Sequence, residues 1–377
     1  EPDKFSLDKE INRLRSDFLS EVVHNTKISP EQHFYTLTAP TGIGKTFSAV
    51  AFAHTLKTRL KNKKTKIIYC LPYTSIIDQN YSEIEKLLQY TLGEEYEKNP
   101  DSYLLRHHYL TPKIIRNRKE GDYSYKDYMD DKLLVESWES DHIVTTFVQL
   151  FHSIIGYRNS FLKKFHNIIN SIIILDEIQV LNPEYYVLIK EVFTIMGKRF
   201  NTYFLLMTAT QPEILDTSIT VPLVDEKKYF LHTIFDRVDL EIQDTPRTIN
   251  EFFHDFKNVF KSNNCLIVLN TKKSALSLYS LVRTEFSHNY KLFCLTTYLT
   301  PFDRLHRIKE IQALLRQNKK IIVISTQLIE AGVDVSFECV YRDFGLLDSI
   351  IQVAGRCNRG GEYFPVRGKM TVIRLKD

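Results

Sequence analysis

A glycine-rich loop with a lysine and a threonine is the stretch of this 377-residue sequence whose residue types and spacing point first to chemistry. Residues 39–46 read A-P-T-G-I-G-K-T, between an apolar, strand-like run (33–38) and helical spacing (47–56). In this context backbone N–H groups bind phosphate oxygens, Lys45 reaches the terminal phosphates and Thr46 ligates Mg²⁺. We interpret it as a phosphate-binding loop, although Ala39 replaces the usual glycine. The alternative is a glycine-rich turn with a chance Lys-Thr.

Two adjacent carboxylates, Asp176 and Glu177, follow the apolar run at residues 172–175. In parallel α/β sheets ligands bind at the carboxyl ends of the strands. There one carboxylate can hold the Mg²⁺ that bridges phosphates, and its neighbour can orient or deprotonate the attacking water. The alternative is an ordinary acidic strand end, which we would favour if the phosphate-binding loop were missing.

A second group of polar residues occurs near the end of the sequence. Gly332 lies in E-A-G-V-D, where a glycine lets the backbone approach a ligand closely. Arg356 and Arg359 are spaced i, i+3 on a predicted helix, so we expect both guanidinium groups to face the same direction. They could stabilise the charge of a phosphoryl-transfer transition state. The alternative is a solvated helix face, which the preceding Gln352 and Gly355 make less attractive.

The elements that position these residues alternate between strand and helix, which predicts an α/β fold with doubly wound parallel sheets. A leading helix is expected at residues 6–23, a charged, solvated insertion at 112–132 and a linker at 221–248. We therefore predict two domains, 1–225 and 226–377. The further predicted strands are 66–71, 142–145, 171–175 and 202–207 in the first domain, and 265–269, 291–295, 321–325, 339–341 and 371–374 in the second.

The composition excludes several classes of protein. A hydrophobic content of 43% indicates a globular chain, and no apolar run is long enough to span a membrane. No signal peptide is recognisable, so we expect a cytoplasmic protein with no membrane partner. The five cysteines form no C-x-x-C pair and are interpreted as reduced core residues. The net charge of +4 permits nucleic-acid binding without arguing for it. The chain begins without methionine, which suggests a piece of a longer protein.

Taken in order, the motifs resemble those of a superfamily 2 helicase. They are A-P-T-G-I-G-K-T, L-P-Y-T-S-I-I-D-Q, D-E-I-Q, M-T-A-T-Q-P, S-T-Q-L-I-E-A-G-V-D and Q-V-A-G-R-C-N-R. More narrowly, L-P-Y-T-S, D-E-I-Q, M-T-A-T-Q-P, N-T-K-K (270–273) and I-N-R-L-R (11–15) resemble the helicase half of the CRISPR-associated helicase-nuclease of type I interference systems. The resemblance covers nearly the whole chain.

The resemblance implies two tandem RecA-like lobes with an interlobe cleft for ATP and Mg²⁺. For catalysis it implies Lys45, Asp176, Glu177, Gln352, Arg356 and Arg359. For nucleotide binding it implies Thr41, Gly42, Gly44, Lys45, Thr46, Gly332 and Asp334, with Thr46 and Asp176 as metal ligands. For coupling between the lobes it implies Thr208 and Thr210. For nucleic acid it implies Pro72, Thr74, Ser75, Thr145, Thr146, Gln149, Asn270, Thr271 and Thr326, whose alternative interpretation is turn chemistry at strand ends.

Similar proteins move 3′ to 5′ on single-stranded DNA, degrade the displaced strand and are recruited by an RNA-guided type I CRISPR surveillance complex. We expect the metal-dependent nuclease of such systems to be a separate chain or a removed domain, because the only His-Asp dipeptide, His254-Asp255, lies among phenylalanines in a helical segment. Two alternatives stay open: a superfamily 2 RNA helicase, and a nucleic-acid-binding module that has lost ATP hydrolysis. The retained Lys45, Asp176 and Glu177 speak against the second.

Overall fold

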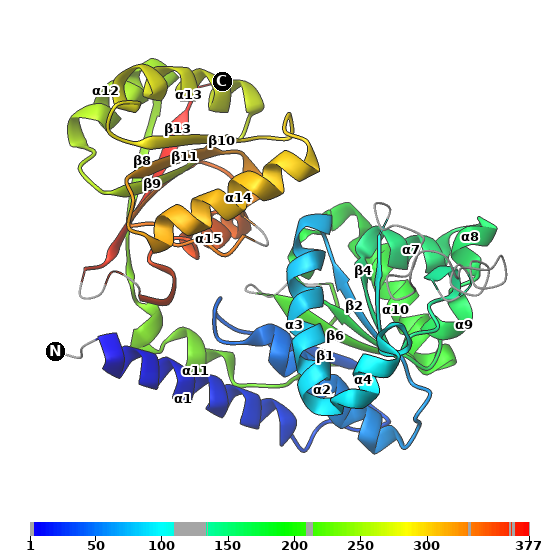
Figure 1. Cartoon of the computed structure of the whole chain (residues 1–377). Coiled ribbons are helices and arrows are strands. Elements are labelled where there is room, and N and C mark those ends of the chain that lie inside the picture. The colour runs from blue at the N-terminus through cyan, green and yellow to red at the C-terminus, as the bar shows by residue number, and fades with distance from the viewer. Residues whose placement is uncertain are drawn as a thin grey trace. The chain divides into compact units, whose positions relative to one another are not determined.

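The protein, described here by a computed structural model, forms two compact units. The first unit comprises Arg13–Phe230, and the second comprises Glu1–Asn12 together with Leu231–Asp377. Helix α1 (Lys4–Val23; blue in Figure 1) therefore begins in the second unit and ends in the first. The structure describes residues 4–108, 133, 135–208, 214–330, 333–361, 363 and 366–376. The predicted insertion at residues 112–132 lies outside them.

The first unit is built on a seven-stranded sheet of order β3-β4-β2-β5-β6-β1-β7. Its strands are β1 (Phe34–Thr38), β2 (Ile67–Leu71), β3 (Leu104–His107), β4 (His142–Thr146), β5 (Ile172–Leu175), β6 (Tyr203–Thr208) and β7 (Val221–Pro222). Every described pair of these strands is parallel. All four residues of β5 are buried, because helices cover both faces of a parallel sheet. The strands predicted for this part of the chain are confirmed.

Helices connect these strands and supply the core of the first unit. They are α2 (Lys45–Leu60), α3 (Thr74–Leu92), α4 (Glu94–Lys98), α5 (Pro100–Tyr103), α7 (Phe147–Ile155), α8 (Asn159–Leu162), α9 (Phe165–Ile168), α10 (Tyr186–Phe200) and α11 (Glu226–Phe230), with short 3₁₀ turns η1 (Ile178–Val180) and η2 (Pro183–Tyr185). Phe193 and Met196 of α10 pack with Leu150 of α7 against apolar side chains of the sheet. Helix α2 is the next element after β1, and the predicted phosphate-binding loop lies between them.

The second unit is also a parallel sheet, of order β10-β11-β9-β12-β13-β8. Its strands are β8 (Val238–Arg247), β9 (Asn264–Val268), β10 (Lys291–Leu295), β11 (Ile321–Ser325), β12 (Cys339–Asp343) and β13 (Gly368–Leu375). Its helices are α12 (Ile249–Val259), α13 (Lys272–Phe286), α14 (Pro301–Arg316) and α15 (Leu347–Ala354), with 3₁₀ turns η3 (Thr233–Phe235), η4 (Gln327–Ile329) and η5 (Arg359–Gly361). Leu266 and Ile267, neighbours on β9, belong to different apolar clusters, so both faces of the sheet are covered. The predicted α/β class is confirmed for both units (Figure 1).

Two local predictions are wrong, and one strand was missed. Residues 221–248 are not simply a linker, because they contain β7, which joins the first sheet, and β8, which forms the edge of the second. The short strand β3 was not predicted at all. The helix expected to carry Arg356 and Arg359 ends earlier, at Ala354, because Gly355 caps it.

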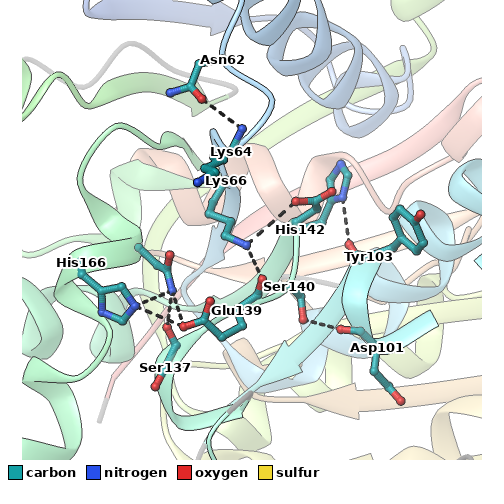
Figure 2. A network of polar contacts seen from close by, with 12 residues as sticks. Asn62, Lys64, Lys66, Asp101, Tyr103, Ser137, Glu139, Ser140, His142 and His166 are labelled. Atoms are coloured by element: carbon teal, nitrogen blue, oxygen red, sulfur yellow. Dashed lines mark hydrogen bonds and ion pairs between the residues drawn. The ribbon is translucent and has the colours of Figure 1, made fainter. Parts of the chain in front are cut away.

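A polar network joins the amino ends of β2 and β4, at the sheet edge opposite the phosphate-binding loop (Figure 2). Lys66 donates to the Glu139 carbonyl and lies 4.0 Å from the Asp141 carboxylate. His142 donates from Nδ1 to the Tyr103 carbonyl at 3.0 Å. Its Nε2 must then accept a hydrogen bond, and His54 Nε2 donates it at 3.1 Å. The His142 imidazole, which accepts at Nε2, is therefore neutral, and burial lowers its pKa to about 3. Burial also lowers the pKa of His54.

Candidate ATP site and nucleic-acid contacts

The phosphate-binding loop has the backbone conformation that its glycines predict. Gly42 and Gly44 have φ values of 88° and 99°, which only glycine adopts without strain. A Cβ at either position would meet no atom within 4 Å, so conformation and not space requires glycine. Among the described residues, no side chain caps the amino end of α2. Its N–H groups and helix dipole therefore suit an anionic ligand.

Lys45 and Thr46, the first two residues of α2, are held by local contacts. Lys45 donates from Nζ to the Ala39 carbonyl at 3.1 Å, so its ammonium group lies over the loop itself. The hydroxyl of Thr46 donates to Oδ1 of Asn80 at 3.3 Å. Asn80 lies on α3 and is buried. The structure thus places the predicted phosphate-binding and metal-binding side chains together at the start of one helix.

Asp176 lies directly after β5 and is only 8% exposed. The hydroxyl of Tyr69, from the neighbouring strand β2, donates to Asp176 Oδ2 at 2.7 Å. Burial and then the charge of Glu177 raise the pKa of Asp176 to about 6, while Lys45 acts in the opposite direction. The positive charge of Lys45 thus favours the ionised form of Asp176, which is the form that can ligate a metal ion.

Glu177 has a φ of 55°, a left-handed conformation that is uncommon for a residue other than glycine. Gln179 donates from Nε2 to Glu177 Oε2 at 2.6 Å. Strained backbone is often kept where it aims a functional side chain. The geometry therefore agrees with a separate task for Glu177, distinct from that of the buried Asp176.

The strand order brings these residues to one edge of the first sheet. Strands β5, β6 and β1 are neighbours in the sheet. Asp176 directly follows β5, Thr208 is the last residue of β6, and the phosphate-binding loop follows β1. Thr208 is 1% exposed, and Thr210 lies outside the described residues. The set offers oxygen donors, which Mg²⁺ prefers, and a lysine for phosphate. The residues present therefore fit a magnesium nucleotide.

Arg15 is a site residue that the motifs did not reveal. From α1 it donates through Nε and Nη2 to the Gly42 carbonyl, at 3.0 and 2.9 Å. Both donors of one guanidinium thus fix the phosphate-binding loop in its left-handed turn. The I-N-R-L-R sequence at residues 11–15 was an available signal, but nothing in it indicates which loop the arginine contacts.

The two arginines predicted to act on the nucleotide from the second unit have different environments. Arg356 is 7% exposed and donates to the carbonyls of Ile329 and Glu330, at 3.3 and 2.8 Å. Arg359 pairs through Nε with Asp334 Oδ1 at 3.1 Å. Because α15 ends before either residue, the expectation that they share one helix face is wrong.

The remaining predicted nucleotide contacts of this unit are Asp334, Gln352 and Gly332. Asp334 accepts a hydrogen bond from Gln312 through its carbonyl, at 3.1 Å, in addition to its pairing with Arg359. Gln352 is partly exposed on α15. Gly332 lies outside the described residues. The roles of these residues toward a nucleotide stay predictions.

Three predicted nucleic-acid contacts have hydroxyls with partners inside the protein, and two of them cap helices after strand ends, the kind of local role that the sequence left open as the alternative. The Thr145 hydroxyl donates to the His107 carbonyl at 2.7 Å. Thr146 caps α7 by accepting from the Gln149 backbone N–H at 3.2 Å. Thr271 caps α13 in the same way, by accepting from the Ser274 N–H at 3.0 Å. These hydroxyls thus have structural partners within the protein, whatever they contact besides.

Asn270 belongs to a buried network that sequence analysis missed. Arg342, 1% exposed, donates to Asn270 Oδ1 at 2.7 Å and pairs with Glu330 Oε1 at 3.2 Å. Ser349 of α15 donates to the same Glu330 oxygen at 2.7 Å. Asn270 Nδ2 donates in turn to the Phe344 carbonyl at 2.7 Å. The Asn270 amide is thus engaged at both ends, which makes it a positioning group for this edge of the sheet.

The remaining predicted nucleic-acid contacts have known positions in the fold, but their roles stay predictions. Pro72 and Thr74 follow β2, at the same carboxyl edge as Asp176. Thr326 follows β11, is 5% exposed, and donates its backbone N–H to the Leu295 carbonyl at 3.1 Å. The Ser75 side chain lies outside the described part of the structure.

Comparison with known proteins defines the class. A DEAD/DEAH box helicase domain matches residues 20–217, more than half of the chain. The chain therefore belongs to the DEAD/DEAH box helicase family, and it is an ATP-hydrolysing helicase. A domain described as CRISPR-associated nuclease/helicase Cas3, C-terminal, matches residues 261–362. The predicted resemblance to the helicase part of such proteins is confirmed.

Individual relatives agree with this assignment. The chain is 27% identical to a CRISPR-associated nuclease/helicase Cas3 of Haloferax volcanii, over 91% of this chain and 46% of the relative. It is 24% identical to one of Methanothermobacter thermautotrophicus, over 90% of this chain and 40% of the relative. The chain thus spans about half the length of the curated relatives, or less. Its fold is similar to T. fusca Cas3 with ADP, at a TM-score of 0.74 and 15% identity, over 96% of this chain and 46% of that one.

The described part of the chain lacks two further kinds of feature. No helix there is long and apolar enough to cross a membrane. No group of three or more His, Cys, Asp or Glu side chains that could hold a metal ion occurs among the same residues. The expected absence of a nuclease site stays a prediction.

Proposed function

We propose that the chain is the ATP-driven motor of a type I CRISPR interference protein and that it moves along single-stranded DNA in the 3′ to 5′ direction. One observation carries this proposal. Lys45, Thr46, Asp176 and Glu177 converge at one edge of a parallel sheet, beside a loop whose glycines leave backbone N–H groups for phosphate. The same convergence argues against an ATPase-inactive binding module.

Each residue of this site has a separate task in the proposed motor. Lys45 and the loop N–H groups bind the phosphates, while Arg15 holds the loop in its binding conformation. Thr46 and Asp176 would hold Mg²⁺, which when bound neutralises phosphate charge. Glu177 orients the attacking water or accepts its proton, because its carboxylate is next to the proposed metal ligand Asp176. Thr208 and Thr210 relay the nucleotide state by hydrogen bonds.

From the second lobe, Gln352, Arg356, Arg359, Gly332 and Asp334 would complete the nucleotide site in a cleft between lobes at residues 1–225 and 226–377. The bonds of the two arginines divide their roles. Arg356 donates to two backbone carbonyls and so shapes the loop that carries Asp334. Arg359 lies at the protein surface, with a side chain that is 25% exposed, and is the better candidate for contact with transferring phosphate.

The substrate and partners are proposed from the relatives. The proposal names single-stranded DNA, an RNA-guided surveillance complex that loads the motor, and a metal-dependent nuclease as a separate chain or another domain, all in the cytoplasm. An RNA helicase is the second candidate, because the fold is also similar to that of Mss116p bound to single-stranded RNA and AMP-PNP. That similarity has a TM-score of 0.59 at 18% identity, over 93% of this chain and 68% of that one. Contacts to phosphate and sugar alone do not separate the two.

ATP turnover measured without nucleic acid, with single-stranded DNA and with RNA of the same sequence tests the proposal. We expect DNA to stimulate turnover more than RNA does, and we expect DNA affinity to fall steeply as salt rises, through counterion release. Stimulation by RNA alone would favour the RNA helicase. Turnover that neither polymer changes would contradict a nucleic-acid motor of either kind.

A further inference from the structure

Tyr298 is a large aromatic side chain left on the surface beside a lysine. It is 68% exposed and lies between β10 and α14, where the proposed function assigns it no role. Lys272, the first residue of α13, places its Nζ 4.5 Å from the centre of the Tyr298 ring. An exposed aromatic ring that gains only a lysine contact is a poor contribution to folding stability. The pair does, however, combine an aromatic ring and an ammonium group, the two kinds of group that bind the bases and phosphates of single-stranded nucleic acid.

The position of this pair agrees with such a role. Strands β10, β11 and β9 are neighbours, and all three are parallel. Tyr298 follows β10, Thr326 follows β11, and Lys272 follows β9. The contact between Tyr298 and Lys272 therefore joins the two flanking strand ends at the edge where Thr326 lies. Asn270 and Thr271, two other predicted nucleic-acid contacts, immediately precede Lys272 in the sequence.

The backbone that carries Tyr298 is fixed before any ligand binds. The Tyr298 N–H donates to the Thr296 hydroxyl at 3.3 Å, and the Leu299 N–H donates to the Thr296 carbonyl at 3.1 Å. Thr296 itself is 3% exposed. Thr300 then caps α14 by accepting from the Asp303 N–H at 3.1 Å. A ring on a defined turn loses little conformational freedom when a base stacks on it.

We propose that Tyr298 and Lys272 form a stacking site for one base of a single strand, the ring contacting the base and the ammonium group contacting an adjacent phosphate. This inference rests on the proposed function, because it names a contact of the strand that the motor tracks. Base stacking on aromatic side chains tolerates any sequence, since every base has a π face. The site would thus hold the strand without reading it, as a translocating motor needs. A protein partner docking on the same ring is the competing occupant, and it would not depend on bases.

Binding of the full chain to two oligonucleotides of equal length tests the inference, one of thymidines and one with abasic positions throughout. Tyr298→Ala should weaken binding of the thymidine strand about tenfold, within the range known for loss of one stacking contact, and leave the abasic strand unaffected. Tyr298→Phe should bind both as the original chain does. Tyr90→Ala is the matched control, since Tyr90 is 92% exposed on α3 and should change neither. Lys272→Gln should weaken both strands and lower the salt dependence of binding.

A second readout uses 2-aminopurine, whose fluorescence is quenched by stacking, at single positions in the thymidine strand. We expect one position to be quenched by the original chain and by Tyr298→Phe but not by Tyr298→Ala. Equal losses on both strands, or no loss on either, would overturn the stacking site while leaving the motor assignment in place. A chain that binds no single strand at all would overturn the proposed function together with this site.

Discussion

Replacing Arg15 by alanine should weaken ATP binding by making the phosphate-binding loop less ordered. The guanidinium donates twice to the Gly42 carbonyl, at 3.0 and 2.9 Å, and Gly42 has a φ of 88°. Because a glycine in open space has many other conformations, the loop depends on contacts of this kind to stay in its binding geometry. Arg15→Ala removes two donors from that carbonyl at once.

The expected effect can be estimated from the contact. Hydrogen bonds with one charged partner contribute about 1.5–3 kcal/mol. Arg15 is exposed to solvent, so the low end of that range applies to the pair of bonds together. A loss of about 1.4 kcal/mol corresponds to a tenfold change in an equilibrium constant. We therefore expect the KM for ATP to rise about tenfold, with a much smaller change in kcat, because Arg15 organises the loop and does not contact the reacting atoms.

Steady-state ATP turnover at saturating nucleic acid measures both parameters. Arg13→Ala is the matched control, since Arg13 is an exposed arginine of the same helix, two residues away. Arg15→Lys keeps the charge but loses the planar pair of donors, so an intermediate KM is expected. An unchanged KM in Arg15→Ala, or the same rise in Arg13→Ala, would refute the reasoning.

Four further predictions concern the ATP site and the stability of the first unit. Lys45→Ala should abolish ATP turnover without altering the circular dichroism spectrum, and equal turnover would disprove the phosphate-loop assignment. Glu177→Gln should retain nucleotide binding but lower turnover about a hundredfold, the scale of general-base help, whereas lost nucleotide affinity would make Glu177 a metal ligand. Arg359→Ala and Arg356→Ala should each lower turnover more than nucleotide affinity. Arg356→Ala should in addition lower the melting temperature, because the substitution leaves two buried carbonyls unpaired. Unchanged turnover in both variants would exclude a role of these arginines at the nucleotide. Burial gives His142 a pKa of about 3 in the folded chain, whereas an unfolded histidine has a pKa of about 6.5. Between pH 7 and pH 5 only the unfolded chain therefore gains this proton, and the free energy of unfolding should fall by about 2 kcal/mol. Urea titrations in which His142→Gln keeps the full pH dependence would contradict this.

The fold and the first half of the site could be predicted because their signals are local. The run I-I-I-L of β5 indicates a buried strand that ends before Asp176, and Gly42 and Gly44 favour the turn before α2. The class of the protein followed from the order of such motifs. Each of these signals lies within a few residues of the element that it specifies.

The features that were missed depend on distant parts of the chain. Strand β8 alternates acidic with apolar residues and contains Pro246, so it reads as a linker until its pairing with β13 is known. Arg356 has the spacing of a surface helix, but its partners Ile329 and Glu330 come from another segment. The partner of Arg15 is 27 residues away. Spacing alone could not identify any of these contacts.

The path of α1 has a consequence for work with fragments of this chain. The start of α1, up to Asn12, belongs to the second unit, where Glu10 lies 3.8 Å from His232, yet it is covalently continuous with the first unit. A protease cut between Phe230 and Leu231 would therefore leave this segment on one fragment and its packing partners on the other. Such fragments have the arrangement used in split-protein complementation, in which a short peptide of one piece completes the folded body of the other.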